Sequence, residues 1–193
     1  MTASQTIKTA ISAHQSVIAQ LDSLTPQIEA LSQKMLHCLQ AGGKIVWMGN
    51  GGSAADSQHL AAEMVVRYQT ERRALASIAL TTDTSILTAA GNDYGFEYVY
   101  ARQVEALCSN KDIVIGISTS GNSPNVLRAI EAAKAMGAYT AGMTGAGGGK
   151  LAQLCDLVLA MPTPVTARAQ EAHILIGHIL CELIDQAYAN QTT

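Results

Sequence analysis

The sequence predicts a single α/β domain over residues 1–193, built on a five-stranded parallel sheet in a flavodoxin-like three-layer sandwich. Two patterns predict this fold. Short apolar segments alternate with longer segments in which apolar residues recur at helical spacing. The short segments are apolar throughout, which is typical of parallel strands buried on both faces by helices. A chain of 193 residues is also long enough to bury a sizeable core.

The first 42 residues predict two helices. Apolar residues recur at helical spacing over residues 4–22. A second helix opens at Thr25-Pro26 and ends before Gly42-Gly43, where proline and glycine stand at their usual ends of a helix. Together they predict an N-terminal helical hairpin over residues 1–42. Because each helix has one apolar face, the pair must pack on the body of the domain or on another subunit.

The α/β body is predicted over residues 43–193. Its expected strands cover residues 45–48, 77–80, 113–118, 139–143 and 157–161. Helices are expected from residue 53 to about 68, over 84–90 and over 97–108. A further helix is expected to begin at residue 124, a short one to follow residue 150, and a long one to cover 166–190. In such sheets ligands bind at the carboxyl ends of the strands, where loops lead into helices.

Composition excludes several classes of function. The net charge is −3, aromatic residues make up 4% of the chain, and no basic cluster is longer than Arg72-Arg73. These features speak against a nucleic-acid partner. No segment of signal-peptide type or of transmembrane length is present, so neither export nor a membrane partner is expected. The four cysteines are far apart and predict buried, reduced thiols in a cytoplasmic protein: Cys38, Cys108, Cys155 and Cys181.

Two strand-to-helix loops have the composition of a ligand site. The first is Asn50-Gly51-Gly52-Ser53, where the glycines allow a close approach of the backbone and Ser53 is expected to cap a helix with Asp56. The second carries four hydroxyls, on Ser118, Thr119, Ser120 and Ser123, before a helix that begins with Pro124. Hydroxyls beside the free N–H groups of a helix start predict a phosphate site that needs no lysine.

One such loop is equally compatible with an ordinary polar turn, but two in one sheet favour a ligand. A Walker-type nucleotide loop is excluded because no Gly-Lys-Ser/Thr follows the glycines, and no Gly-x-Gly-x-x-Gly supports a dinucleotide. The glycine-rich segment 145–150 is interpreted as a flexible turn.

A second group of residues has the chemistry of a metal or acid–base site. His59 and Glu63 are four residues apart and share one face of a helix. In isolation, a solvent-exposed pair without a role is the more common case. On the C-terminal helix, Gln170 and His178 lie about 80° apart on one side, and His173 is turned away from His178. The spacing leaves open which histidine faces a site and which is a core residue.

Nearly the whole chain resembles the phosphoheptose isomerases of the sugar isomerase (SIS) class. The motifs that carry the resemblance are Gly49-Asn50-Gly51-Gly52-Ser53, His59-x-x-x-Glu63 with Arg67-Tyr68, Gly91-Asn92-Asp93-x-Gly95-Phe96, Gly116 to Ser123, and Gln170-Glu171-x-His173 with His178. The serine loop alone marks only the wider class.

The resemblance implies an isomerase that converts D-sedoheptulose 7-phosphate to D-glycero-D-manno-heptose 7-phosphate through an enediol, the first step toward ADP-heptose for lipopolysaccharide. Glu63 would be the base and His178 the acid. The phosphate would be held by Ser118, Thr119, Ser120 and Ser123, with Ser53 adjacent. The sugar would be contacted by Asn50, Gly51, Gly52, Asn92, Asp93 and Gln170. One zinc ion per subunit would be held by His59, Glu63, Gln170 and His178. The assembly would be a homotetramer with the N-terminal helices in its contacts.

Two alternatives belong to other classes of function. Close relatives in the same family are non-enzymatic scaffolds that bind the replication initiator DnaA, and the stretch from Ala79 to Asp83 leans toward them. In those relatives the glutamate and the final histidine are replaced, whereas this chain retains both Glu63 and His178. A sugar-phosphate sensor module would explain the serine loop but would leave the two histidines and Glu63 without a role.

Overall fold

A parallel five-stranded sheet forms the centre of the molecule, as the sequence predicts. The computed structural model describes residues 1–189. The strand order is β2-β1-β3-β4-β5, and every neighbouring pair is parallel. The strands are β1 (Ile45–Gly49), β2 (Ser77–Ala79), β3 (Ile113–Ser118), β4 (Tyr139–Thr144) and β5 (Leu157–Ala160). This is the doubly wound order in which the chain changes direction between β1 and β3.

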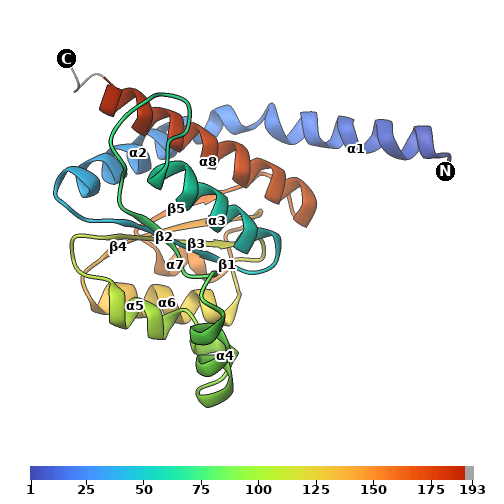
Figure 1. Cartoon of the computed structure of the whole chain (residues 1–193). Helices are drawn as coiled ribbons and strands as arrows, with labels where there is room; N and C mark the ends of the chain where they lie inside the picture. The colour runs from blue at the N-terminus through green and yellow to red at the C-terminus, as the bar shows by residue number, and fades with distance from the viewer. Residues whose placement is uncertain (190–193) are drawn as a thin grey trace.

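Helices cover both faces of the sheet (Figure 1). One face carries α2 (Thr25–Gln40), α3 (Gly52–Val65) and α8 (Thr166–Ala189). The other carries α4 (Thr84–Asp93), α5 (Ala101–Leu107), α6 (Pro124–Ala135) and the short α7 (Leu151–Leu154). Alternate residues of β1 serve the two cores: Ile45 and Trp47 pack toward α3 and α8, and Val46 and Met48 pack toward α6. Burial on both faces explains why the strand segments are apolar throughout.

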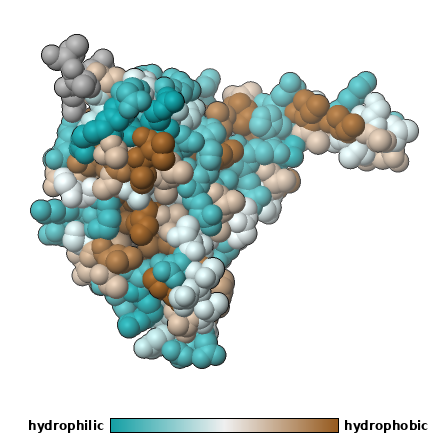
Figure 2. All heavy atoms as spheres, viewed as in Figure 1, coloured by the Kyte–Doolittle hydropathy of each residue, from teal (hydrophilic) through white to brown (hydrophobic). Residues whose placement is uncertain are grey.

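The helix α1 (Ala3–Ile18) runs outward from the body (Figure 1). It begins with a capping box between Thr2 and Gln5, and the short helix η1 (Leu21–Leu24) joins it to α2. The predicted helical hairpin is wrong, because α1 does not fold back along α2 and its main contacts with the body are made with α8. Ile7 and Ile11 are 58% and 54% exposed. Figure 2 shows hydrophobic residues along this projecting helix, so α1 has an apolar face that no other part of residues 1–189 covers.

Two predicted helix boundaries are wrong for reasons of tertiary structure. The helix α3 ends at Val65 rather than near residue 68, because the Arg72 guanidinium donates hydrogen bonds to backbone carbonyls of its last turn. The predicted helix over 97–108 is divided into η2 (Phe96–Tyr98) and α5. The last predicted helical residue, 190, lies outside the described residues.

The predicted cap of α3 is also wrong. Its N-cap is Gly51, with φ +56°, and no side chain caps the helix. Ser53 is instead the second residue of the helix, and its side chain is buried. Over residues 1–189, no helix is both long enough and apolar enough to cross a membrane.

Candidate active site

The loops after β1 and β3 lie side by side because these strands are neighbours and parallel. Two amides join the loops. Asn50 Nδ2 donates to Asn125 Oδ1 at 2.9 Å, and Asn125 Nδ2 donates to Asn50 Oδ1 at 2.8 Å. Asn125, in the first turn of α6, is buried and is absent from the predicted site. The Asn50 side chain therefore fixes the relative position of the two loops.

The hydroxyls of the serine loop converge at the start of α6. Ser118 Oγ lies 2.8 Å from Ser123 Oγ and 3.4 Å from Ser120 Oγ. Ser123 is the N-cap of α6 but makes no side-chain capping hydrogen bond, and Pro124 occupies the first turn. The Ser123 hydroxyl is thus turned toward the other serines instead of toward the helix backbone. This arrangement suits a phosphate, which accepts hydrogen bonds and is attracted by the helix dipole.

The glycine-rich segment 145–150 supports the serine loop, a role that its interpretation as a flexible turn missed. Gly145 N donates to Thr119 O at 2.9 Å, and Lys150 N donates to Asn122 Oδ1 at 3.1 Å. Leu151 N donates to Gly121 O at 3.0 Å. These contacts follow from the sheet order, because β3 and β4 are also neighbours and their carboxyl ends share one edge.

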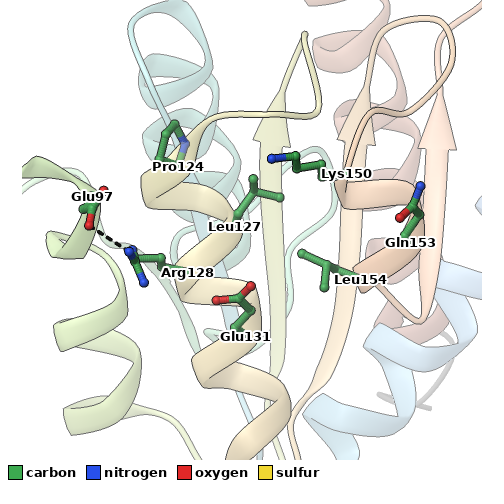
Figure 3. A pocket seen from close by; sticks show the side chains of 8 residues that line it. All are labelled: Glu97, Pro124, Leu127, Arg128, Glu131, Lys150, Gln153 and Leu154. Carbon is green, nitrogen blue, oxygen red and sulfur yellow. Dashed lines mark hydrogen bonds and ion pairs between the residues drawn. The ribbon is translucent and has the colours of Figure 1, made fainter.

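Two hollows lie beside the first turn of α6. One of about 280 Å³ is lined in part by Asn50, Ser123 and Asn125, so it opens beside the serine loop. The other, of about 450 Å³, lies between α6 and α7 (Figure 3). Its wall includes the ion pair of Arg128 Nη2 with Glu97 Oε1 at 2.8 Å. None of the predicted site residues lines this larger hollow.

Two histidines and a glutamate meet between α3 and α8. His59 Nε2 lies 2.9 Å from His178 Nε2 and 3.4 Å from Glu63 Oε1. The ring of Tyr68 stacks on His178, with centroids 5.4 Å apart and planes inclined by 26°. The structure thus brings together residues 119 positions apart in the sequence. His173 is instead buried, and its Nε2 lies 3.0 Å from Thr144 O.

Close packing of α3 on α8 fixes this meeting point. A Cβ atom at Gly177 would lie 2.6 Å from the methyl carbons of Leu60, so α8 can approach α3 only with glycine there. A Cβ atom at Gly52 would lie 2.8 Å from Gln170 Nε2. The Gln170 amide therefore lies against the start of α3, on the same helix as His178.

The donor set suits a divalent cation such as zinc. Two imidazole nitrogens and a carboxylate are common zinc ligands, and the amide oxygen of Gln170 is a further donor on the same helix. Zinc–nitrogen bonds of about 2.0–2.1 Å in tetrahedral geometry place two ligand nitrogens about 3.3 Å apart. His59 and His178, at 2.9 Å, would have to separate slightly to share an ion. Within residues 1–189, no group of three or more His, Cys, Asp or Glu side chains is already spaced to hold one.

Asp56 is an acidic group near this site for which the sequence predicts only a role in a helix cap. Its Oδ2 atom is buried and has no hydrogen-bond partner within the described part of the chain. Burial raises the pKa of the Asp56 carboxyl above its ordinary value, and the nearby His59 opposes this shift. Its position three residues before His59, on the same helix, is the signal that could have identified it.

Asn92 and Asp93 lie apart from the histidines. They end α4, which packs mainly on η2 and projects from the side of the sheet opposite to α3 and α8 (Figure 1). Both are exposed, and Asn92 Nδ2 donates to Asp93 Oδ1 at 2.8 Å. Within one copy of the chain they do not join His59 and His178.

Comparison with known proteins finds similar chains that share one family. A family model described as SIS domain matches residues 11–145. Phosphoheptose isomerase 1 of Campylobacter jejuni is 55% identical over 175 residues, which cover 91% of this chain and 94% of that protein. The structure of phosphoheptose isomerase GmhA from Neisseria gonorrhoeae has a TM-score of 0.90 and 43% identity, covering 96% of this chain and all of that one. A phosphoheptose isomerase structure from Francisella tularensis has a TM-score of 0.93 and 37% identity, with the same coverage.

Proposed function

This chain belongs to the phosphoheptose isomerase family of SIS-domain proteins, and we propose that it converts D-sedoheptulose 7-phosphate to D-glycero-D-manno-heptose 7-phosphate. The observation that carries the proposal is the meeting of Glu63 and His178 beside His59. A scaffold or a sensor would need the serine loop but would have no use for a carboxylate and an imidazole brought together from two helices.

The serine loop is proposed to bind the phosphate of the substrate. The Ser118 hydroxyl lies within hydrogen-bond distance of the hydroxyls of Ser120 and Ser123, and the N-terminus of α6 adds a favourable dipole. Thr119 and Ser53 border the same edge of the sheet. With the phosphate held there, the sugar extends across the Gly51-Gly52 turn toward α3 and α8.

The reaction moves one proton between carbons and one between oxygens. We assign Glu63 as the base that removes the proton from C1 of the ketose and returns it to C2 of the enediol. His178 donates a proton to O2 as the enediol forms and accepts the proton of O1 as the aldehyde appears. Proton transfer by a positioned carboxylate and imidazole is the ordinary means of such isomerisation. The stacked Tyr68 ring holds the His178 imidazole in its orientation.

We further propose that His59, Glu63, Gln170 and His178 hold one zinc ion per subunit, and that Glu63 and His178 loosen from the ion when substrate binds, so that they are free to exchange protons with it. A bound divalent cation would supply stabilisation for the negative charge that develops on the enediolate oxygens. The donor chemistry of these four side chains supports the assignment.

Solvent exchange into sedoheptulose 7-phosphate tests this function directly. Incubated with the protein and zinc in D₂O, the sugar is expected to take up deuterium at C1 or C2 and to yield an aldose, as seen by NMR. Treatment with a chelator is expected to stop both processes, and added zinc to restore them. Binding of the sugar phosphate without exchange would refute the isomerase and support the sensor or scaffold. Full exchange after metal removal would refute only the role of zinc.

The homotetramer is also a proposal, supported by the exposed apolar face of α1. The double change Ile7→Lys and Ile11→Lys is expected to shift sedimentation from tetramer to smaller species, because lysine cannot be buried without a partner. Since both side chains are exposed, the monomer fold should be unaffected. Ser12→Lys with Ser16→Lys, on the opposite side of the helix, is the matched control. A tetramer in both variants would exclude α1 from the contacts.

A further inference from the structure

A buried ion pair joins the two helices that carry the active site. Arg72, in the loop after α3, places its Nε atom 2.8 Å from Asp185 Oδ1 on α8. The two side chains are 1% and 2% exposed. Neither residue belongs to the predicted site. A buried ion pair is weak support for stability by itself, because desolvation offsets much of the attraction. Its position therefore needs a further reason.

Arg72 fixes the end of the helix that carries Glu63. Its Nη2 atom donates to Glu63 O at 2.8 Å, and its Nη1 atom donates to Met64 O at 2.9 Å. Carbonyls in the last turn of a helix have no partner within that helix, and a cation there is favoured by the helix dipole. The main chain of the proposed base is thus held directly by the guanidinium.

Asp185 acts on the other side of the same site. It follows His178 by seven residues on α8, about two helical turns, so the two side chains share one side of the helix. Its Oδ2 atom accepts hydrogen bonds from Gln69 N at 2.8 Å and Thr70 N at 2.9 Å. These residues directly follow Tyr68, whose ring stacks on His178.

We propose that Arg72 and Asp185 are positioning residues of the isomerase, which set the distance and orientation of Glu63 relative to His178. The pair connects three segments whose relative positions determine the geometry of the site. These are the end of α3, the segment that carries Tyr68, and the face of α8 that carries His178. This inference rests on the proposed function. It adds that catalysis depends on groups that touch neither the substrate nor the proposed metal.

The variant Asp185→Asn tests the inference with little change in shape. The amide keeps an acceptor for Arg72 but presents N–H groups to the backbone donors of Gln69 and Thr70. Removal of a residue that orients the ligands of a metal site typically lowers activity or metal affinity by about 10–100-fold. We expect kcat to fall by that factor while KM for the sugar phosphate stays within about twofold, because the serine loop is untouched.

Asp112→Asn is the matched control. Asp112 is also 2% exposed, pairs with Lys44 Nζ at 2.7 Å, and accepts from the backbone N–H groups of Lys44 and Ser109. For both carboxyls burial alone would raise the pKa, but hydrogen bonds hold it below the ordinary value. Asp112 directly precedes β3, at the opposite end of the strands from the site. A comparable loss of thermal stability but an unchanged kcat is expected there.

Two further measurements keep the inference open to refutation. If Asp185→Asn does not fold, Arg72→Lys retains the cation but only part of the hydrogen bonding, and it is expected to show the same selective loss of kcat. In NMR spectra of the protein without substrate, the imidazole nitrogen resonances of His59 and His178 should shift in either variant and stay unchanged in Asp112→Asn. An inert wild-type protein would refute the proposed function, and the histidine spectra would then decide the positioning role. Wild-type kcat and histidine spectra in folded Asp185→Asn or Arg72→Lys would overturn it.

Discussion

Glu63→Gln is expected to lower kcat by about 10²–10⁴-fold, the contribution typical of a positioned general base. Glutamine has nearly the same shape as glutamate but cannot take a proton from carbon. The phosphate would still bind, because the serine loop belongs to β3 and α6 and Glu63 belongs to α3. Steady-state assays give kcat, and calorimetry with sedoheptulose 7-phosphate gives the dissociation constant.

Glu105→Gln is the control for this experiment. Glu105 is an exposed carboxylate of α5 that pairs with Arg102, so the substitution removes the same charge far from the histidines. Its kcat should match that of the wild type. Turnover near the wild-type value in Glu63→Gln would remove Glu63 from the mechanism. Because Glu63 is also a proposed zinc ligand, the metal content of both variants should be measured alongside.

The sheet was predictable because each strand is determined by its own residues. The strand Ile113–Ser118 has the predicted bounds at both ends, since its side chains are apolar on both faces. The end of α3 was not predictable, because it depends on Arg72, which reaches back to the carbonyls of Glu63 and Met64. The local sequence pattern of a helix cannot predict a hydrogen-bond partner that comes from a different segment of the chain.

Some features of the site were likewise predictable from local sequence, and others depend on tertiary packing. Helical spacing places His59 beside Glu63, but it cannot decide whether His173 or His178 faces them. That choice depends on the rotation of α8, which is set by the contact of Gly177 with Leu60. The resemblance to the isomerases selected His178, and the structure places it 2.9 Å from His59. Asn125 and the glycine-rich loop were missed because their roles arise from the order of the strands.

Gly121→Ala is expected to weaken phosphate binding. Gly121 has φ +65°, and a Cβ atom there would lie 2.1 Å from Gly148 O. Gly121 lies within the serine loop, between Ser120 and Ser123. Its added methyl group would push the glycine-rich loop away from the serine loop. Loss of one hydrogen bond to a charged group is worth about 1.5–3 kcal/mol, so KM should rise by about 10–150-fold.

Gly147→Ala separates this contact from backbone strain. Gly147 has φ +82°, but a Cβ atom there would meet nothing within 4 Å. Both variants carry the strain of alanine in the left-handed region, about 1 kcal/mol, which corresponds to a lowering of Tm by about 2–4 °C. Only Gly121→Ala should also raise KM. If KM rises equally in both, strain in either loop is enough to disturb the phosphate site. If it rises in neither, the serine loop keeps its shape without the glycine-rich loop, and the hydroxyls of Ser118 and Ser123 are positioned by β3 and α6 alone.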